Sequence, residues 1–177
     1  MASKGMSPLQ VLELAMERER GGREFYLKAA ATTRDGKGKQ MFEWLARQEE
    51  GHLNRLTRQR DALASGGSWP RLAAGELGEP LRKVEFPKAA EARGKVEVVT
   101  GELEALKTGI QAEKDSVALY SEAARTSSQP GAKAMFEGLV KEEQGHLDLL
   151  EAEYEWLSKS KTYFTLHRFS LRPPGQA

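Results

Sequence analysis

The amino-acid sequence predicts an all-α fold, an antiparallel four-helix bundle with one long crossover. Three observations support it: four segments with the apolar period of a helix, connections of very unequal length, and an internal repeat at a constant offset of 94 residues. The 177 residues are enough for one ordinary domain and too few for two large ones. We expect one domain over residues 1–158 and a tail over residues 159–177.

The first two helices are expected to form a hairpin. Ser7 is a favourable N-cap and Pro8 suits the first helical position, so the first helix should run from residue 7 to about residue 31. Turn-forming residues follow at 34–38. A second run with helical period then extends to Leu63, just before a Ser-Gly-Gly sequence that can end a helix.

The connection after the second helix is much longer. Residues 66–98 are rich in proline and glycine and have no sustained period, so we expect a crossover along the bundle, with one helical turn near residues 87–92. A third helix is expected from about residue 100 to 125, and a fourth from the loop at 126–131 to about residue 158. Because each pair has a short connection, its two helices should be antiparallel neighbours.

Composition limits the chemistry available to the chain. Lys and Arg together number 27 and Asp and Glu 26, a net charge of +1, so neither nucleic acid nor an anionic membrane is an expected partner. No segment is apolar enough for a membrane span, and residues 1–6 lack the apolar core of a signal peptide, which favours a cytoplasmic location. The sequence has no cysteine, so any metal must be held by nitrogen and oxygen atoms.

The internal repeat covers the central part of each hairpin. Residues 19–52 align with residues 113–146 without a gap, and 13 of the 34 positions are identical. The two halves of the chain are therefore copies of one helical hairpin. We expect the copies to pack with pseudo-two-fold symmetry, so that equivalent residues face each other across the axis.

Each copy places ionisable residues on its apolar stripe, where a core normally has leucine. They are a glutamate on the first helix and a Glu-x-x-His on the second, namely Glu19, Glu49 and His52 with their copies Glu113, Glu143 and His146. Residues at i and i+3 share one face of a helix and can reach one ion. Four carboxylates in a bundle interior would repel one another and lose hydration, so the pattern predicts two divalent cations, with imidazoles completing the ligand set.

This pattern resembles the di-iron carboxylate site of the ferritin-like superfamily. The rubrerythrin branch is the most similar, through the sequence ERGGREFYLKAA and its copy EKDSVALYSEAA, and the likeness covers about residues 7–158. The resemblance implies a ferritin-like bundle with two iron ions, for which manganese or zinc are alternatives. It implies bridging ligands Glu49 and Glu143, terminal ligands Glu19 and Glu113, and one histidine per iron, His52 and His146.

Tyr26 and Tyr120 lie seven residues after the glutamates of the first and third helices, on the same stripe. The resemblance implies that both donate hydrogen bonds to the ligands and take part in catalysis from outside the ligand set. Simple packing on the helix seam is the alternative for both.

The resemblance implies a non-haem di-iron oxidoreductase that reacts with hydrogen peroxide or dioxygen, in protection against oxidative stress. Full-length rubrerythrins carry a cysteine-rich rubredoxin domain that supplies electrons, and this cysteine-free chain would need an external donor. Many also have a further carboxylate three residues after the glutamate of the third helix, where this chain has Ser116. Two alternatives stay open: a ferroxidase-like protein for iron binding, storage or transfer, and a metal-free bundle with a polar network. A homo-oligomer is expected, with a homodimer as the simplest case.

The remaining polar residues on these helices are expected to serve solubility. We interpret Glu43, Glu50, Glu137 and Glu142 as solvated or paired within their helix, and the run 55–60 as a solvated basic face. His167 lies in the basic tail, where a surface or interface role is expected.

Overall fold

The computed structural model describes residues 7–67, 69, 100–160 and 163. These ranges form four α-helices and no strand, which confirms the all-α prediction. The helices are α1 (Pro8–Thr32), α2 (Gly36–Ala64), α3 (Thr100–Thr126) and α4 (Pro130–Ser160). Among the described helices, none combines the length and apolar character that crossing a membrane requires.

The start of α1 forms as expected. The Ser7 hydroxyl accepts a hydrogen bond from the Gln10 backbone N–H, the Gln10 side chain accepts one from the Ser7 N–H, and Pro8 is the first helical residue. These contacts satisfy N–H groups that have no partner inside the helix.

The predicted turn at 34–38 is too long. The structure leaves only residues 33–35 outside the helices, and α2 already begins at Gly36. The reason is Asp35, whose carboxylate accepts hydrogen bonds from the backbone N–H groups of Lys37 and Gly38. This N-cap offsets the low helix propensity of the two glycines. The loop predicted at 126–131 is also too long, because α3 ends at Thr126 and α4 begins at Pro130.

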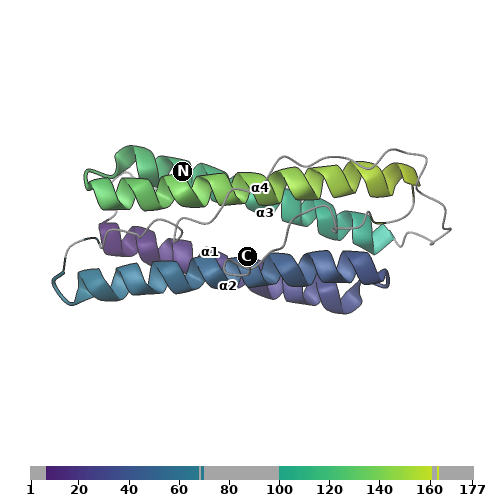
Figure 1. Cartoon of the computed structure of the whole chain (residues 1–177), viewed down its shortest axis with the longest axis horizontal. Coiled ribbons are helices and arrows are strands. Elements are labelled where there is room, and N and C mark those ends of the chain that lie inside the picture. Colours follow the sequence, from purple (N-terminus) through teal and green to yellow (C-terminus); the bar gives the residue numbers. More distant parts are fainter. Residues whose placement is uncertain (1–6, 68, 70–99, 161–162, 164–177) are drawn as a thin grey trace, which may run out of the picture.

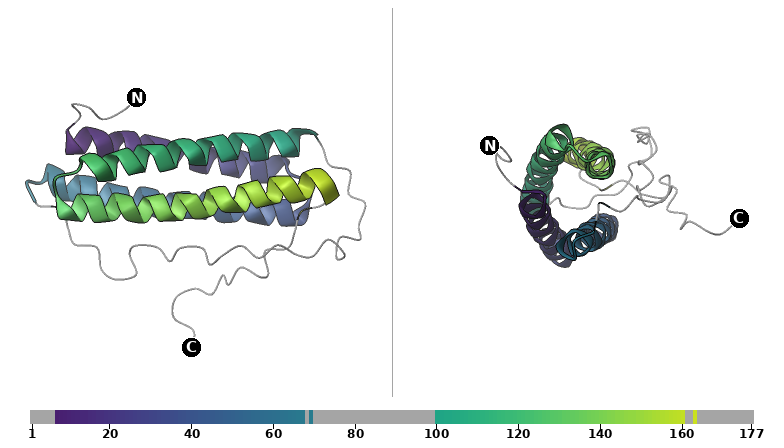
Figure 2. Two further views of the ribbon diagram at one scale, coloured as in Figure 1. Left: turned by 90° about the horizontal axis from the view of Figure 1, so that it is seen from above. Right: turned by 90° about the vertical axis from the view of Figure 1, so that its left-hand side faces the viewer.

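The helices pack as two antiparallel hairpins, α1 with α2 and α3 with α4 (Figure 1). The view along the helices shows α1 and α3 side by side where the two hairpins meet (Figure 2). The two helices of each hairpin therefore contact each other along their length. The site described below lies between the two hairpins.

Two apolar clusters occupy the two halves of the bundle. One contains Tyr26, Phe42 and Leu150, and the other contains Tyr120, Phe136 and Leu56, the same residues displaced by the repeat. The four-helix middle between the clusters carries the buried glutamates and histidines. The repeat thus builds two equivalent cores on either side of one polar layer.

Most of the predicted crossover at 66–98, including the helical turn near 87–92, lies outside the described residues, as do His167 and most of the tail. Tyr163 is the part of the tail that the structure describes beyond α4. Its ring is buried against the α1–α2 connection, where a Cβ atom added at Gly38 would lie 2.6 Å from ring carbons. Glycine at position 38 is therefore what lets the ring pack directly on the backbone of α2.

Candidate metal centre

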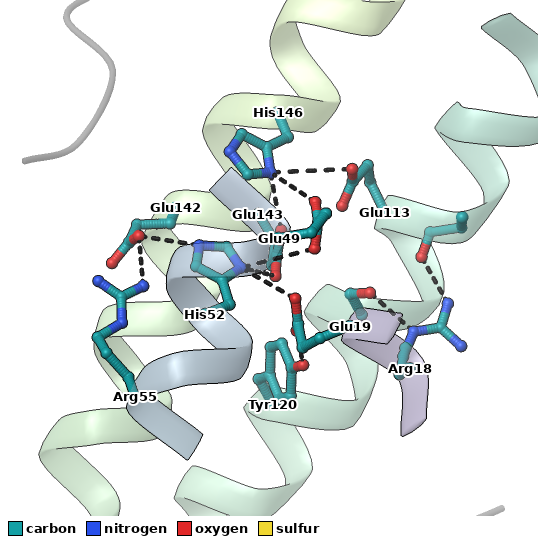
Figure 3. A network of polar contacts seen from close by, with 12 residues as sticks. Arg18, Glu19, Glu49, His52, Arg55, Glu113, Tyr120, Glu142, Glu143 and His146 are labelled. Atoms are coloured by element: carbon teal, nitrogen blue, oxygen red, sulfur yellow. Dashed lines mark hydrogen bonds and ion pairs between the residues drawn. The ribbon is translucent and has the colours of Figure 1, made fainter. Parts of the chain in front are cut away.

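The structure brings all six predicted ligands to one place in the middle of the bundle (Figure 3). Each helix contributes: α1 and α3 one glutamate each, α2 and α4 a glutamate and a histidine one turn apart. All six side chains are buried, with relative exposures between 0% and 4%. They are Glu19, Glu49, His52, Glu113, Glu143 and His146.

The ligand atoms include two overlapping groups of four residues, in each of which all atoms lie within 4.8 Å of one another, and a group of three, His52, Glu143 and His146, joins the two. The first group is Glu19, Glu49, His52 and Glu143, and the second is Glu49, Glu113, Glu143 and His146. Glu49 and Glu143 belong to both groups. Four donors around each of two neighbouring points, with two carboxylates shared, is an arrangement suited to a pair of cations.

Both histidines present the same nitrogen to the centre. Nδ1 of His52 lies 3.2 Å from Glu19 Oε2 and 3.0 Å from Glu143 Oε1. Nδ1 of His146 lies 2.9 Å from Glu143 Oε2 and 3.5 Å from Glu49 Oε1. The two rings are nearly parallel, at 16°, with centroids 5.5 Å apart. The pseudo-symmetry of the repeat is therefore preserved at the ligand nitrogens.

The two tyrosines cross between the hairpins. The hydroxyl of Tyr26 on α1 donates to Glu113 on α3, and the hydroxyl of Tyr120 on α3 donates to Glu19 on α1. Burial and the neighbouring carboxylates raise the pKa of both phenols well above its usual range. Both hydroxyls therefore stay protonated and act as donors at neutral pH.

Because the four carboxylates lie close together, their pKa values in the metal-free cluster are shifted in opposite directions. Burial, together with the charges of Glu49 and Glu143, raises the pKa of Glu19 and of Glu113 well above the usual range for a glutamate. Although burial opposes it, hydrogen bonds from neighbouring groups lower the pKa of Glu49, and the charge of His52 lowers that of Glu143. These shifts favour protonation of the two terminal glutamates in the metal-free state.

The pKa values of the histidines are also shifted toward the protonated form. Burial alone would lower the pKa of an imidazole, but the surrounding carboxylates raise the pKa of His52 well above its usual range and that of His146 to about 10. Two protonated glutamates and two imidazolium groups would balance the four carboxylates of the cluster in the metal-free state.

Two buried oxygens provide a test of whether cations fit here. Oε1 of Glu49 and Oε1 of Glu143 are buried and accept no hydrogen bond of good geometry, although Nδ1 of His146 lies 3.5 Å from the first oxygen and Nδ1 of His52 lies 3.0 Å from the second. They belong to the two carboxylates that both ligand groups share. A buried carboxylate oxygen without a donor is costly, and a cation between the two groups would satisfy it. The residues present therefore fit a pair of divalent ions.

One residue at the site was predicted wrongly. Glu142 was expected to be solvated or paired within its own helix, yet its exposure is 8%, and it lies 2.9 Å from Nε2 of His52 and 2.6 Å from Arg55, both on α2 (Figure 3). Although burial opposes it, the hydrogen bonds from His52 and Arg55 lower the pKa of Glu142 to about 2. Arg55 was expected on the solvated face 55–60, but only 14% of its side chain is exposed because it reaches from α2 to Glu142 on α4. The other three glutamates lie in ion pairs on the surface.

Ser116 has a partner that the sequence did not indicate. Arg18 on α1 donates from Nε to the Ser116 hydroxyl at 2.7 Å and from its terminal nitrogen to the Ala112 carbonyl at 2.6 Å. Arg18 also pairs with Asp115 at 3.5 Å. The guanidinium group of Arg18 therefore lies beside Ser116 and between α1 and α3.

Comparison with known proteins agrees with this geometry. The family model described as Rubrerythrin matches residues 10–154. A solved structure of a hypothetical protein from Pyrococcus furiosus superposes with a TM-score of 0.67 and 23% sequence identity, covering 90% of this chain and 95% of the other. At that identity the second match supports the fold alone. The curated proteins include no match to this chain.

Proposed function

Because the chain belongs to the rubrerythrin family, we propose that its central cluster holds two iron ions and reduces hydrogen peroxide or dioxygen with electrons from an external donor. The observation that carries the proposal is the pair of overlapping ligand groups that share Glu49 and Glu143. Glu19 and His52 would complete the ligands of one ion, and Glu113 and His146 those of the other.

The charges of the ligand set support iron or another divalent metal. Four carboxylates carry four negative charges, which two divalent cations balance when both imidazoles are neutral. The oxygen-rich ligand set, with one imidazole per ion and no sulfur, suits iron and manganese and can accept zinc. The same balance is reached by protons in the metal-free state, so metal and protons compete for the cluster.

Residues around the ligands orient them and hold protons. The tyrosine hydroxyls fix one oxygen of each terminal glutamate, Tyr26 on Glu113 and Tyr120 on Glu19. This leaves the second oxygen of each carboxylate for an ion. The two apolar clusters on either side exclude water along the bundle axis, which strengthens the electrostatic interactions at the centre. Both hydroxyl groups are buried and in direct contact with the terminal glutamates.

When bound, the two ions would supply two electrons, which with two protons reduce hydrogen peroxide to two molecules of water. The external donor must then return two electrons for each turnover, because the chain has no cysteine to hold an iron–sulfur or rubredoxin-type centre. The cytoplasmic location and a homo-oligomeric state belong to the same proposal.

Reconstitution with Fe(II) under anaerobic conditions tests the function. We expect two ions per chain and an absorption band of the oxidised pair after addition of peroxide or oxygen, with the faster oxidant identifying the preferred substrate. E143Q should lose most metal binding, because both ligand groups use Glu143. E137Q on the exposed face of α4 is the matched control and should behave as the wild type. Two bound ions that neither oxidant oxidises would contradict the proposal.

Ser116 favours a second candidate function, ferroxidase-like iron handling for storage or transfer. The six-residue ligand set lacks the further carboxylate at this position, and the Ser116 hydroxyl instead bonds to Arg18. Solution mass and turnover distinguish the two functions. Oxidation of Fe(II) that stops once the site is full and needs no reductant, or a large hollow assembly with many ions per chain, would favour iron handling.

A further inference from the structure

The two halves of the candidate metal centre differ on the outer side of the histidines. Inside, His52 and His146 are equivalent: each turns Nδ1 toward the carboxylates. Outside, the residues at equivalent repeat positions are not the same. Glu142 corresponds to Gln48, and Arg55 corresponds to Leu149.

The outer nitrogen of His52 has a charged partner. Nε2 lies 2.9 Å from Glu142 Oε2, and the same oxygen accepts a hydrogen bond from Arg55 at 2.6 Å. An ionised carboxylate only accepts hydrogen bonds, so the hydrogen of a neutral His52 ring lies on Nε2. The lone pair is then on Nδ1, the nitrogen that faces the centre.

The outer nitrogen of His146 lacks such a partner. Within the part of the chain that the structure describes, no hydrogen bond reaches its Nε2, and the ring instead contacts the indole of Trp44 edge-on, with centroids 5.5 Å apart at 84°. Packing can orient this ring, but it does not select which nitrogen carries the hydrogen.

Carboxylate partners of a metal-bound histidine fix its tautomer and increase the basicity of the ligand nitrogen, and their loss commonly lowers metal affinity by 10–100-fold. We propose that Glu142, held by Arg55, is a positioning residue that makes the two metal positions unequal, so that the ion beside Glu19 and His52 binds first. This inference rests on the proposed two-metal centre. It adds an order of filling, which the symmetric ligand set does not contain.

The test is a site-resolved measurement of metal occupancy. Because the two ions share Glu49 and Glu143, the second ion binds more weakly than the first in any case, so the position of the first ion decides. The full-length protein is crystallised with one equivalent of Mn(II), and anomalous scattering gives the occupancy of each position. In the wild type we expect roughly tenfold more Mn(II) at the His52 position.

Two variants exchange the outer partners. E142Q gives the His52 side the residue that the other copy has, and should bring the two occupancies close to equal. Q48E adds a carboxylate at the repeat position equivalent to Glu142 and should raise occupancy at the His146 position, which keeps the inference testable if E142Q does not fold. A general loosening of the fold would lower both occupancies together and leave their ratio unchanged.

The outcomes separate the inference from the function on which it rests. Equal filling in the wild type, or a preference for the His52 position that E142Q leaves unchanged, overturns the inference while an excess of Mn(II) still fills two positions. If excess Mn(II) and Fe(II) each fill fewer than two positions in the wild type, the two-metal centre itself is refuted and the inference falls with it.

Discussion

Metal loading should release about four protons per chain at pH 7. In the metal-free protein the raised pKa values of His52 and His146 favour a proton on each imidazole, and those of Glu19 and Glu113 favour two more protons on the cluster. Two divalent ions replace these four positive charges without changing the net charge of the buried layer. A cluster that kept its protons on metal binding would instead gain four uncompensated charges in a low-dielectric interior.

The magnitude follows from His146. Its pKa of about 10 lies 3 units above pH 7, so removing its proton there costs about 4 kcal/mol, roughly a thousandfold in metal affinity. Because the metal-free state binds more protons, affinity must rise with pH. With two protons released per ion, the apparent dissociation constant should increase about 100-fold for each unit by which the pH falls.

The assay is addition of Mn(II) to metal-free protein in weakly buffered solution, with base uptake recorded at constant pH. E137Q, which replaces an exposed glutamate in the repeat, serves as the control and should release the same number of protons as the wild type. Release of no more than one proton per chain at saturation would refute the assignment of protons to the cluster, whatever the metal affinity proves to be.

Three further predictions concern stability. Y26F removes the hydroxyl that donates to buried Glu113, and should lower the free energy of unfolding by about 1.5–3 kcal/mol in denaturant titrations; no change would show that the bond contributes nothing. G38A places a Cβ against the Tyr163 ring and should cost about 1–3 kcal/mol; if Y163A does not relieve this cost in the double variant, the two positions are not coupled. The pKa of about 2 for Glu142 means that its ionised carboxylate stabilises the fold above about pH 4.5 and that this stabilisation is lost as the pH falls toward 2. The free energies of unfolding of wild type and E142Q, measured by thermal unfolding, should therefore differ by about 3 kcal/mol less at pH 2 than at pH 7. A difference that does not change with pH would contradict this.

The six residues at the centre could be predicted because each breaks the apolar stripe of its helix, and the repeat shows the same break twice. Glu19 and Glu113 would be unremarkable as single surface charges. Helical period places each on the inward face, and the structure finds both buried. Periodicity, the short loops and the cysteine-free composition were sufficient for the bundle and for the kind of donor atoms at its centre.

Glu142 was missed because its signal is not periodic. It directly precedes a ligand, about 100° away around the helix, and its copy in the repeat is Gln48, so neither the stripe nor the repeat marks it. For the tyrosines, the sequence indicated the position on the stripe but not the hydrogen-bond partner. Each hydroxyl donates to the glutamate of the other hairpin.

The sequence by itself determined the helices, the two-copy architecture and the six inward ionisable residues, because these depend on spacing along one chain. Only the tertiary structure decided which groups meet across helices: the exchange of tyrosine hydroxyls between hairpins, the docking of Tyr163 on Gly38, and the Arg55–Glu142–His52 contact. Such contacts depend on the distance between helix surfaces and on the side chain that fills it. A period along one helix carries no information about either.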